Sequence, residues 1–212
     1  MTIYEKIESH RLVPVVALNN VSDALNLADA LIAGGLPVAE ITFRTSAAEE
    51  SIRIISKERP DMLVGAGTVT KIEQVAAAAD AGAKFIVTPG FSKKITEAAI
   101  KQGLPVFPGV CTPTEIMQTL EYDLPVLKFF PASQYGGLKT IKALNGPFPN
   151  IRFMPTGGIN KDNLAEYLNY SGVTACGGSW MVGSKLIGEG KFGEITQLTK
   201  EAVELIAGLS KN

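Results

Sequence analysis

The amino-acid sequence predicts an α/β protein in which eight strand-helix units close into one (β/α)8 barrel. Two observations predict this fold. Short runs of β-branched and aromatic residues alternate with amphipathic stretches along the whole chain. Eight such units fill the 212 residues, a length close to the lower limit of about 200 residues for this barrel. We therefore expect residues 1–212 to form a single domain.

The eight expected strands are short and rich in Val, Ile, Phe and Thr, which is typical of parallel strands buried on both faces. In chain order they are residues 13–18, 38–44, 63–69, 85–90, 105–110, 126–132, 152–158 and 173–180.

The stretches between the strands are expected to be helices. Val21, Leu25, Ala28 and Ile32 fall on one stripe of the first, for example. Three later helix starts have the spacing of a capping box, at Ser46 with Glu49, at Thr70 with Glu73, and at Thr112 with Glu115.

Strand-helix-strand units at this spacing require parallel pairing and right-handed crossovers, which allow a closed barrel or an open doubly wound sheet. No G-x-G-x-x-G motif follows the first strand, so the closed barrel, a TIM barrel, is favoured.

Composition limits the classes of partner. Lys and Arg total 20 against 21 Asp and Glu, a formal net charge of -1, which gives no general attraction for nucleic acid or an anionic membrane. The charged segment 1–11 precedes an apolar run too short for a secretory signal or a membrane span. Cys111 and Cys176 have no metal-binding spacing, so a reducing compartment, the cytoplasm, is expected. The single histidine, His10, and both cysteines are expected to take no part in catalysis.

The second expected strand carries the first candidate residues. Alternation along the strand places Glu40, Thr42 and Arg44 on one face. The outer face of a barrel strand packs under helices, so this polar face should point into the barrel. Active sites of such barrels lie at the C-terminal ends of the strands. Arg44 suits a planar carboxylate because guanidinium donates two parallel hydrogen bonds.

The sixth expected strand contains a lone lysine, Lys128, among apolar neighbours. Burial disfavours the charged form of an amine, so that part of the lysine can be the free base that attacks a carbonyl carbon. Lys128 is therefore the candidate nucleophile. The alternative is a purely structural ion pair between Lys128 and Glu40 inside the barrel.

Glycine-rich turns end the seventh and eighth strands, at Gly157 with Gly158 and at Gly177-Gly178-Ser179. Glycine allows backbone N–H groups to approach an anion, and the turns after strands seven and eight are the usual phosphate site of this barrel. Thr68 and Pro89, at the ends of strands three and four, add a hydroxyl group and a rigid apolar wall to the same rim. Thr68 could hold a carboxylate together with Arg44.

The chain resembles the 2-dehydro-3-deoxy-6-phosphogluconate aldolase and 4-hydroxy-2-oxoglutarate aldolase family. The motifs that carry the resemblance occur in order along the whole chain: Glu40-Ile-Thr-Phe-Arg44-Thr45, Gly65-Ala-Gly-Thr68, Val87-Thr-Pro89-Gly90, Pro108-Gly-Val, Lys128-Phe-Phe130-Pro131-Ala, Pro155-Thr-Gly-Gly-Ile159 and Gly177-Gly-Ser-Trp180.

The resemblance implies a homotrimeric class I lyase that forms a Schiff base between a lysine and pyruvate. It implies Lys128 as the Schiff-base lysine and Glu40 as the general acid and base. The other implied roles are substrate binding: the pyruvate carboxylate on Arg44 and Thr68, the pocket wall from Pro89 and Phe130, and the phosphate on Gly157, Gly158 and Ser179.

Three alternatives remain open at this stage. The enzyme could prefer unphosphorylated 4-hydroxy-2-oxoglutarate. A metal-dependent aldolase is disfavoured, because the strand ends supply no histidine and no second clear carboxylate, so no metal and no other cofactor is expected. The barrel could also be a non-catalytic phosphosugar-binding protein.

Overall fold

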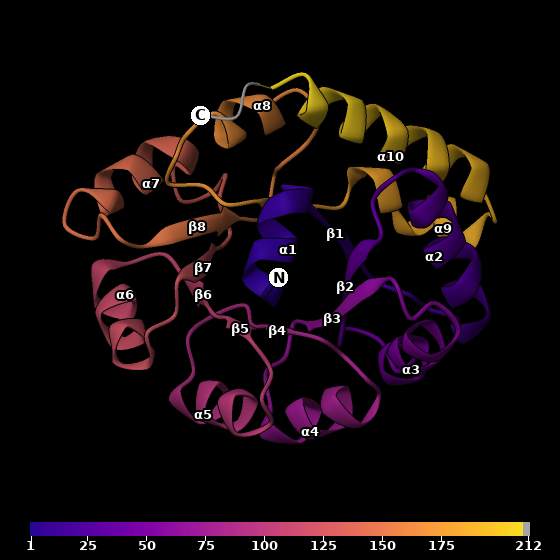
Figure 1. The fold of residues 1–212 in the computed structure, drawn as a ribbon, viewed down its shortest axis with the longest axis horizontal. Helices are drawn as coiled ribbons and strands as arrows, with labels where there is room; N and C mark the ends of the chain where they lie inside the picture. Colours follow the sequence, from indigo (N-terminus) through magenta and orange to yellow (C-terminus); the bar gives the residue numbers. More distant parts are fainter. Residues whose placement is uncertain (210–212) are drawn as a thin grey trace.

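The computed structural model describes residues 1–209, in which parallel strands form a ring surrounded by helices (Figure 1). The strand order is β5-β4-β3-β2-β1-β9 in one sheet and β6-β7-β8 in the other, and all pairs are parallel. Single bridges from Phe153 to Val173 and from Thr156 to Gly177 join β8 to β9. The predicted (β/α)8 barrel is confirmed. Residues 210–212 of the expected domain lie outside the described residues.

The strands are β1 (Leu12–Val16), β2 (Val38–Thr42), β3 (Leu63–Gly67), β4 (Ile86–Val87), β5 (Val106–Phe107), β6 (Gly109–Val110), β7 (Val126–Phe129), β8 (Arg152–Pro155) and β9 (Cys176–Gly178). The helices are α1 (Ile3–His10), α2 (Ala24–Ala33), α3 (Ala48–Glu58), α4 (Ile72–Asp80), α5 (Lys93–Lys101), α6 (Pro113–Thr119), α7 (Gly137–Asn145), α8 (Leu164–Leu168), α9 (Ser184–Gly188) and α10 (Phe192–Ala207), with 3-10 turns η1 (Val21–Asp23), η2 (Leu120–Tyr122) and η3 (Trp180–Val182).

The strands are shorter than the sequence predicts, and the fifth one is divided. Pro108 separates β5 from β6 because proline has no N–H group to donate to a neighbouring strand. Its carbonyl oxygen still accepts from the Lys128 N–H group, at 2.9 Å. The two pieces therefore occupy the place of one barrel strand.

The predicted helix starts are only partly correct. Thr112 and Glu115 form the expected capping box, with Pro113 at the first helical position. In contrast, α3 begins at Ala48 without a side-chain cap, so the box predicted at Ser46 with Glu49 is wrong. The box predicted at Thr70 with Glu73 is also wrong: the backbone N–H groups of Thr70 and Lys71 donate to the side chain of Gln74.

Helix α1 is a feature that the sequence analysis does not predict. It lies over the middle of the ring in Figure 1. Ile7 is fully buried, the Tyr4 ring lies 5.0 Å from the Phe107 ring, and the Tyr4 hydroxyl donates to the carbonyl oxygen of Val106. Since Val106 begins β5, α1 covers the N-terminal ends of the strands. The opposite end of the barrel stays open.

An ion pair attaches α1 to the first residue of β8. Both guanidinium Nη atoms of Arg152 bind the Glu8 carboxylate, at 2.8 and 2.7 Å. The hydrogen bonds from Arg152 lower the pKa of Glu8 below its ordinary value. A lowered folded-state pKa stabilises the fold above the unfolded-state pKa, and this contribution is lost as the pH falls through the folded-state value.

Replacing Glu8 with glutamine is therefore expected to lower the free energy of unfolding at pH 7 by about 0.2–1 kcal/mol, the usual range for an exposed pair. The difference from the wild type should shrink as the pH falls from the unfolded-state pKa of Glu8 through its lowered folded-state pKa, because Glu8 then becomes protonated in both states. Urea unfolding at pH 7 and at pH 3 measures both values. A constant difference between the two pH values would contradict this account.

None of the helices within residues 1–209 has both the length and the apolar content needed to cross a membrane.

Candidate active site

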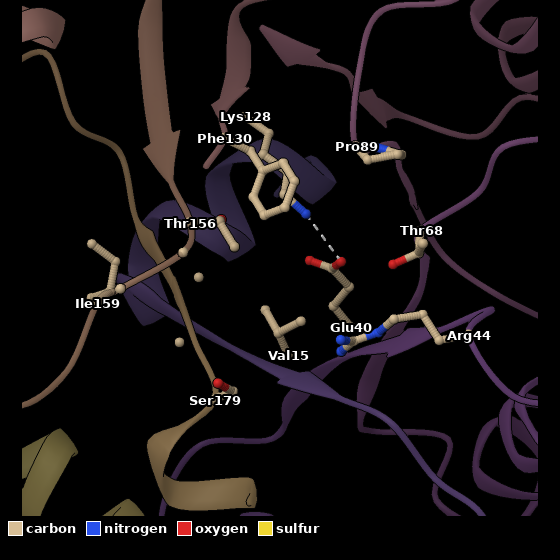
Figure 2. A pocket seen from close by; sticks show the side chains of 14 residues that line it. Val15, Glu40, Arg44, Thr68, Pro89, Lys128, Phe130, Thr156, Ile159 and Ser179 are labelled. Atoms are coloured by element: carbon tan, nitrogen blue, oxygen red, sulfur yellow. Dashed lines mark hydrogen bonds and ion pairs between the residues drawn. The ribbon is translucent and has the colours of Figure 1, made fainter. Parts of the chain in front are cut away.

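A cavity of about 260 Å³ opens at the C-terminal ends of the strands. All nine residues that the sequence analysis selected line it: Glu40, Arg44, Thr68, Pro89, Lys128, Phe130, Gly157, Gly158 and Ser179. Figure 2 shows that the Lys128 amine points toward Glu40, with Arg44, Thr68 and Pro89 on one side of the cavity and Ile159 and Ser179 on the other.

Lys128 and Glu40 form an ion pair across the inside of the barrel. Lys128 lies on β7 and Glu40 on β2, and Lys128 Nζ is 3.3 Å from Glu40 Oε1. Their side chains are 5% and 0% exposed. The Phe130 ring lies beside the amine, with its centroid 5.0 Å from Nζ. Within the described residues, Glu40 Oε2 has no hydrogen-bond partner although it is buried, so this oxygen can accept a proton or a hydrogen bond from a bound molecule.

The side chain of Glu40 fits inside the barrel because position 67 is glycine. A Cβ atom at Gly67 would overlap the Glu40 carboxyl group, 2.6 Å from its Cδ atom. Gly67 is the last residue of β3, directly opposite Thr42 of β2. The Gly65-Ala-Gly-Thr68 segment thus leaves the space that the buried carboxylate occupies.

Arg44 lies just beyond the end of β2, which stops at Thr42 and not at Arg44 as the sequence analysis expected. Arg44 Nε donates to Thr42 Oγ1 at 3.1 Å, and the Thr42 hydroxyl donates to the carbonyl oxygen of Val16 at 2.7 Å. Among residues 1–209, the two Nη atoms of Arg44 have no hydrogen-bond partner, so the guanidinium group is free to bind a carboxylate.

Thr68 has a left-handed backbone, with φ at 52°. This conformation is unfavourable for a β-branched residue and costs on the order of 1–3 kcal/mol. Strain of this kind is concentrated at functional sites, where the surrounding structure enforces it. Here it places Thr68 on the cavity wall, on the same side as Arg44 (Figure 2).

The glycine-rich turns form the other side of the cavity. Gly157 and Gly158 have φ values of +97° and +78°, which glycine adopts without strain. No α-helix begins directly after either turn: α8 begins only at Leu164, and Ser179 precedes the 3-10 turn η3. An anion at this side would therefore be bound by turn N–H groups and not by a long helix N-terminus.

His10 and the two cysteines do not line this cavity. His10 is half-buried, and burial lowers its pKa. Cys176 is buried, which raises the pKa of its thiol, whereas Cys111 is half-buried beside Glu115. Within residues 1–209, no three His, Cys, Asp or Glu side chains are grouped so that they could hold a metal ion.

The sequence profile of one protein family, described as KDPG and KHG aldolase, matches residues 3–198. The chain belongs to this family. A 2-dehydro-3-deoxy-phosphogluconate aldolase of Haemophilus influenzae is 47% identical over 204 residues, which cover 96% of each chain.

Two solved structures of similar fold add information about the family. A KDPG aldolase from Legionella pneumophila, with pyruvate captured as a covalent carbinolamine intermediate, has a TM-score of 0.91 and 38% identity. The match covers 95% of this chain and 98% of that one. A designed protein cage made by fusing symmetric oligomeric domains has a TM-score of 0.81 and 30% identity over 93% of this chain and 72% of its own.

Five cavity residues of this KDPG and KHG aldolase family member are not among the nine selected from the sequence: Val15, Thr156, Ile159, Gly177 and Gly178. Thr156 directly follows β8 and is 5% exposed. Like Thr68, it carries a hydroxyl group at the end of a barrel strand. The same sequence pattern could therefore have predicted Thr156. Val15 lies opposite Glu40 on β1, and an apolar residue in an apolar strand gives no signal of its own.

Proposed function

We propose that this chain is a class I aldolase that reversibly cleaves 2-dehydro-3-deoxy-6-phosphogluconate to pyruvate and glyceraldehyde 3-phosphate. It also cleaves 4-hydroxy-2-oxoglutarate to pyruvate and glyoxylate. The observation that carries the proposal is a lysine amine and a carboxylate 3.3 Å apart, both buried, in the cavity at the C-terminal end of the barrel. The family and the carbinolamine in a relative of similar fold support it.

In the first step, the free amine of Lys128 attacks the C2 carbonyl carbon of the 2-oxo acid and forms a carbinolamine. Glu40 lies within reach of this nitrogen, so it can take a proton from the amine and return one to the departing hydroxyl group. Loss of water leaves a protonated imine, whose positive nitrogen can accept an electron pair.

In the second step, Glu40 removes the proton from the C4 hydroxyl group. The C3–C4 bond breaks, its electrons move to the imine, and the aldehyde leaves. Protonation of the resulting enamine at C3 and hydrolysis of the imine return pyruvate and the Lys128 amine. Glu40 Oε2, buried and without a partner in residues 1–209, is the oxygen free for this proton.

The two sides of the cavity suit the two ends of the substrate. Arg44 and Thr68 bind the carboxylate, and Pro89 and Phe130 line the pocket around the reacting carbons. The phosphate lies at the turn of Gly157 and Gly158 and at Ser179. This assignment is supported by the positions in Figure 2, where Lys128 and Glu40 lie between the two sides.

Replacing Arg44 with lysine is expected to raise KM for the 2-oxo acid about tenfold or more, because a charged, bidentate hydrogen bond is worth about 1.5–3 kcal/mol. The catalytic pair remains, so kcat should change less than KM. Steady-state cleavage kinetics measure both. Arg53→Lys is the matched control, since Arg53 is partly exposed on α3 and its partners are Glu49, Glu50 and a backbone oxygen. A fall in kcat with unchanged KM would show that Arg44 does not bind the substrate.

Direct assay of cleavage tests the proposed function. Purified protein is mixed with each of the two substrates, and pyruvate is followed through a coupled dehydrogenase. Higher kcat/KM for the phosphorylated substrate is expected from the second, glycine-lined side of the cavity. The activity should be the same with and without excess EDTA, because catalysis is assigned to the Lys128 amine and not to a metal ion. Binding of phosphorylated sugars without any release of pyruvate would favour a non-catalytic binding barrel.

The finer properties of the protein are also proposals. We propose that it acts as a homotrimer, which is supported by the likeness to a symmetric oligomeric domain and by exposed Met117, Leu120 and Tyr135. We propose that residues 1–212 form one domain, supported by the closed ring of strands. The two free cysteines support a cytoplasmic location.

A further inference from the structure

We propose that Ser133 is a positioning residue that holds the Gly157-Gly158 peptide group with its N–H toward the phosphate of the substrate. The inference rests on the proposed function, since it deepens the assignment of the phosphate end of the same cavity. Ser133 follows β7, is exposed, and does not line the cavity itself. It therefore acts through the turn and not by touching the substrate.

Ser133 donates two hydrogen bonds to the same carbonyl oxygen. Its backbone N–H group and its hydroxyl group both lie 3.1 Å from the oxygen of Gly157. A carbonyl oxygen has two lone pairs and can accept both. Any residue except proline at position 133 would supply the backbone donor, but only a side chain with a suitably placed donor group adds the second.

The direction of the Gly158 N–H group follows from peptide geometry. In a planar trans peptide, the carbonyl oxygen of Gly157 and the N–H of Gly158 point in opposite directions. Because the oxygen faces Ser133, the N–H points away from Ser133. Gly158 lines the cavity, and within residues 1–209 its N–H group has no acceptor. This donor is free for an anion bound in the cavity.

The side chain of Ser133 also packs directly on the turn. A Cβ atom at Gly158 would lie 2.6 Å from Ser133 Cβ and would overlap the hydroxyl oxygen. Two glycines in the left-handed region have many alternative conformations, and a peptide between them can rotate. The hydroxyl group restrains that rotation, and its hydrogen bond to the carbonyl polarises the peptide so that its N–H is a stronger donor.

The test compares Ser133→Ala with the wild type, using inorganic phosphate as a competitive inhibitor of cleavage. We expect the inhibition constant of phosphate, and KM for 2-dehydro-3-deoxy-6-phosphogluconate, to rise about three- to tenfold, the effect of losing one hydrogen bond. Pyruvate has no phosphate, so the pyruvate concentration for half-maximal borohydride trapping should stay unchanged. Ser133→Thr, which keeps the hydroxyl group, should restore phosphate binding.

Ser171→Ala is the matched control, because Ser171 is exposed and lines a groove beside α1, at the N-terminal end of the barrel. Unchanged phosphate inhibition in Ser133→Ala would overturn the inference, and so would an equal weakening of phosphate and pyruvate binding. A wild-type protein that neither releases pyruvate nor is trapped by borohydride would contradict the proposed function instead. The two failures are therefore distinguishable.

Discussion

Replacing Lys128 with alanine is expected to abolish cleavage, with a loss in kcat on the order of 10⁶, the size found when a covalent nucleophile is removed from an enzyme. The physical reason is that no other amine is placed to form the imine. Within residues 1–209, Lys128 is the only lysine that lines the cavity. Cleavage is measured by pyruvate release, and imine formation by borohydride trapping.

The alanine variant leaves the buried Glu40 carboxylate without its partner, which can cost about 3–5 kcal/mol of folding free energy. Circular dichroism and thermal unfolding show whether the variant is folded. Lys128→Arg supplies a second test, since arginine keeps the positive charge beside Glu40 but forms no imine. Lys139→Ala, on an exposed position of α7, is the control. A folded Lys128→Arg variant that still cleaves substrate would refute the assignment of the nucleophile.

Replacing Glu40 with glutamine is the second large effect that we expect. Glutamine has nearly the same shape but cannot accept the proton of the C4 hydroxyl group, so kcat should fall about 10²–10⁴-fold, the usual contribution of a general acid or base. KM should change less, because Arg44 and the glycine-rich turns are intact. Single-turnover kinetics then separate slow imine formation from slow bond cleavage.

Glu50→Gln is the matched control for this substitution. Glu50 lies on α3, and its side chain is 53% exposed in a pair with Arg53, so its replacement should leave kcat within about twofold of the wild type. The account of Glu40 fails if Glu40→Gln behaves like this control in a protein of unchanged thermal stability.

The sequence predicts the barrel because each strand-helix unit contains its own signal. Apolar runs alternate with amphipathic stretches, and parallel pairing follows from the short connections. The strand limits could not be predicted, since they depend on hydrogen bonds between strands that are distant in the sequence. The break at Pro108 is one example. Proline breaks a strand only where a carbonyl oxygen of the neighbouring strand needs a hydrogen bond from that position, and the local sequence does not show which strand is the neighbour.

Helix α1 was missed for a related reason. Its sequence is largely polar, and Ile7 is its only fully buried residue. The burial comes from tertiary contacts of Tyr4 and Ile7 with the end of the barrel. The local sequence pattern does not predict such contacts.

The pair of Lys128 and Glu40 could be predicted because charged residues in buried strands are rare and, in a barrel, should point inward. Lys128 and Glu40 are 88 positions apart, yet the barrel brings them together. Val15 could not be found in this way, and the contact between Ser133 and Gly157 depends on a turn conformation that the sequence does not reveal.

The central claim is that Lys128 forms a Schiff base with pyruvate, and reductive trapping tests it most directly. The protein is treated with saturating pyruvate and borohydride, and its intact mass and peptide map are measured. We predict one reduced pyruvyl group per chain, on the peptide that contains Lys128. An unmodified protein, or an adduct on another lysine, would contradict the account.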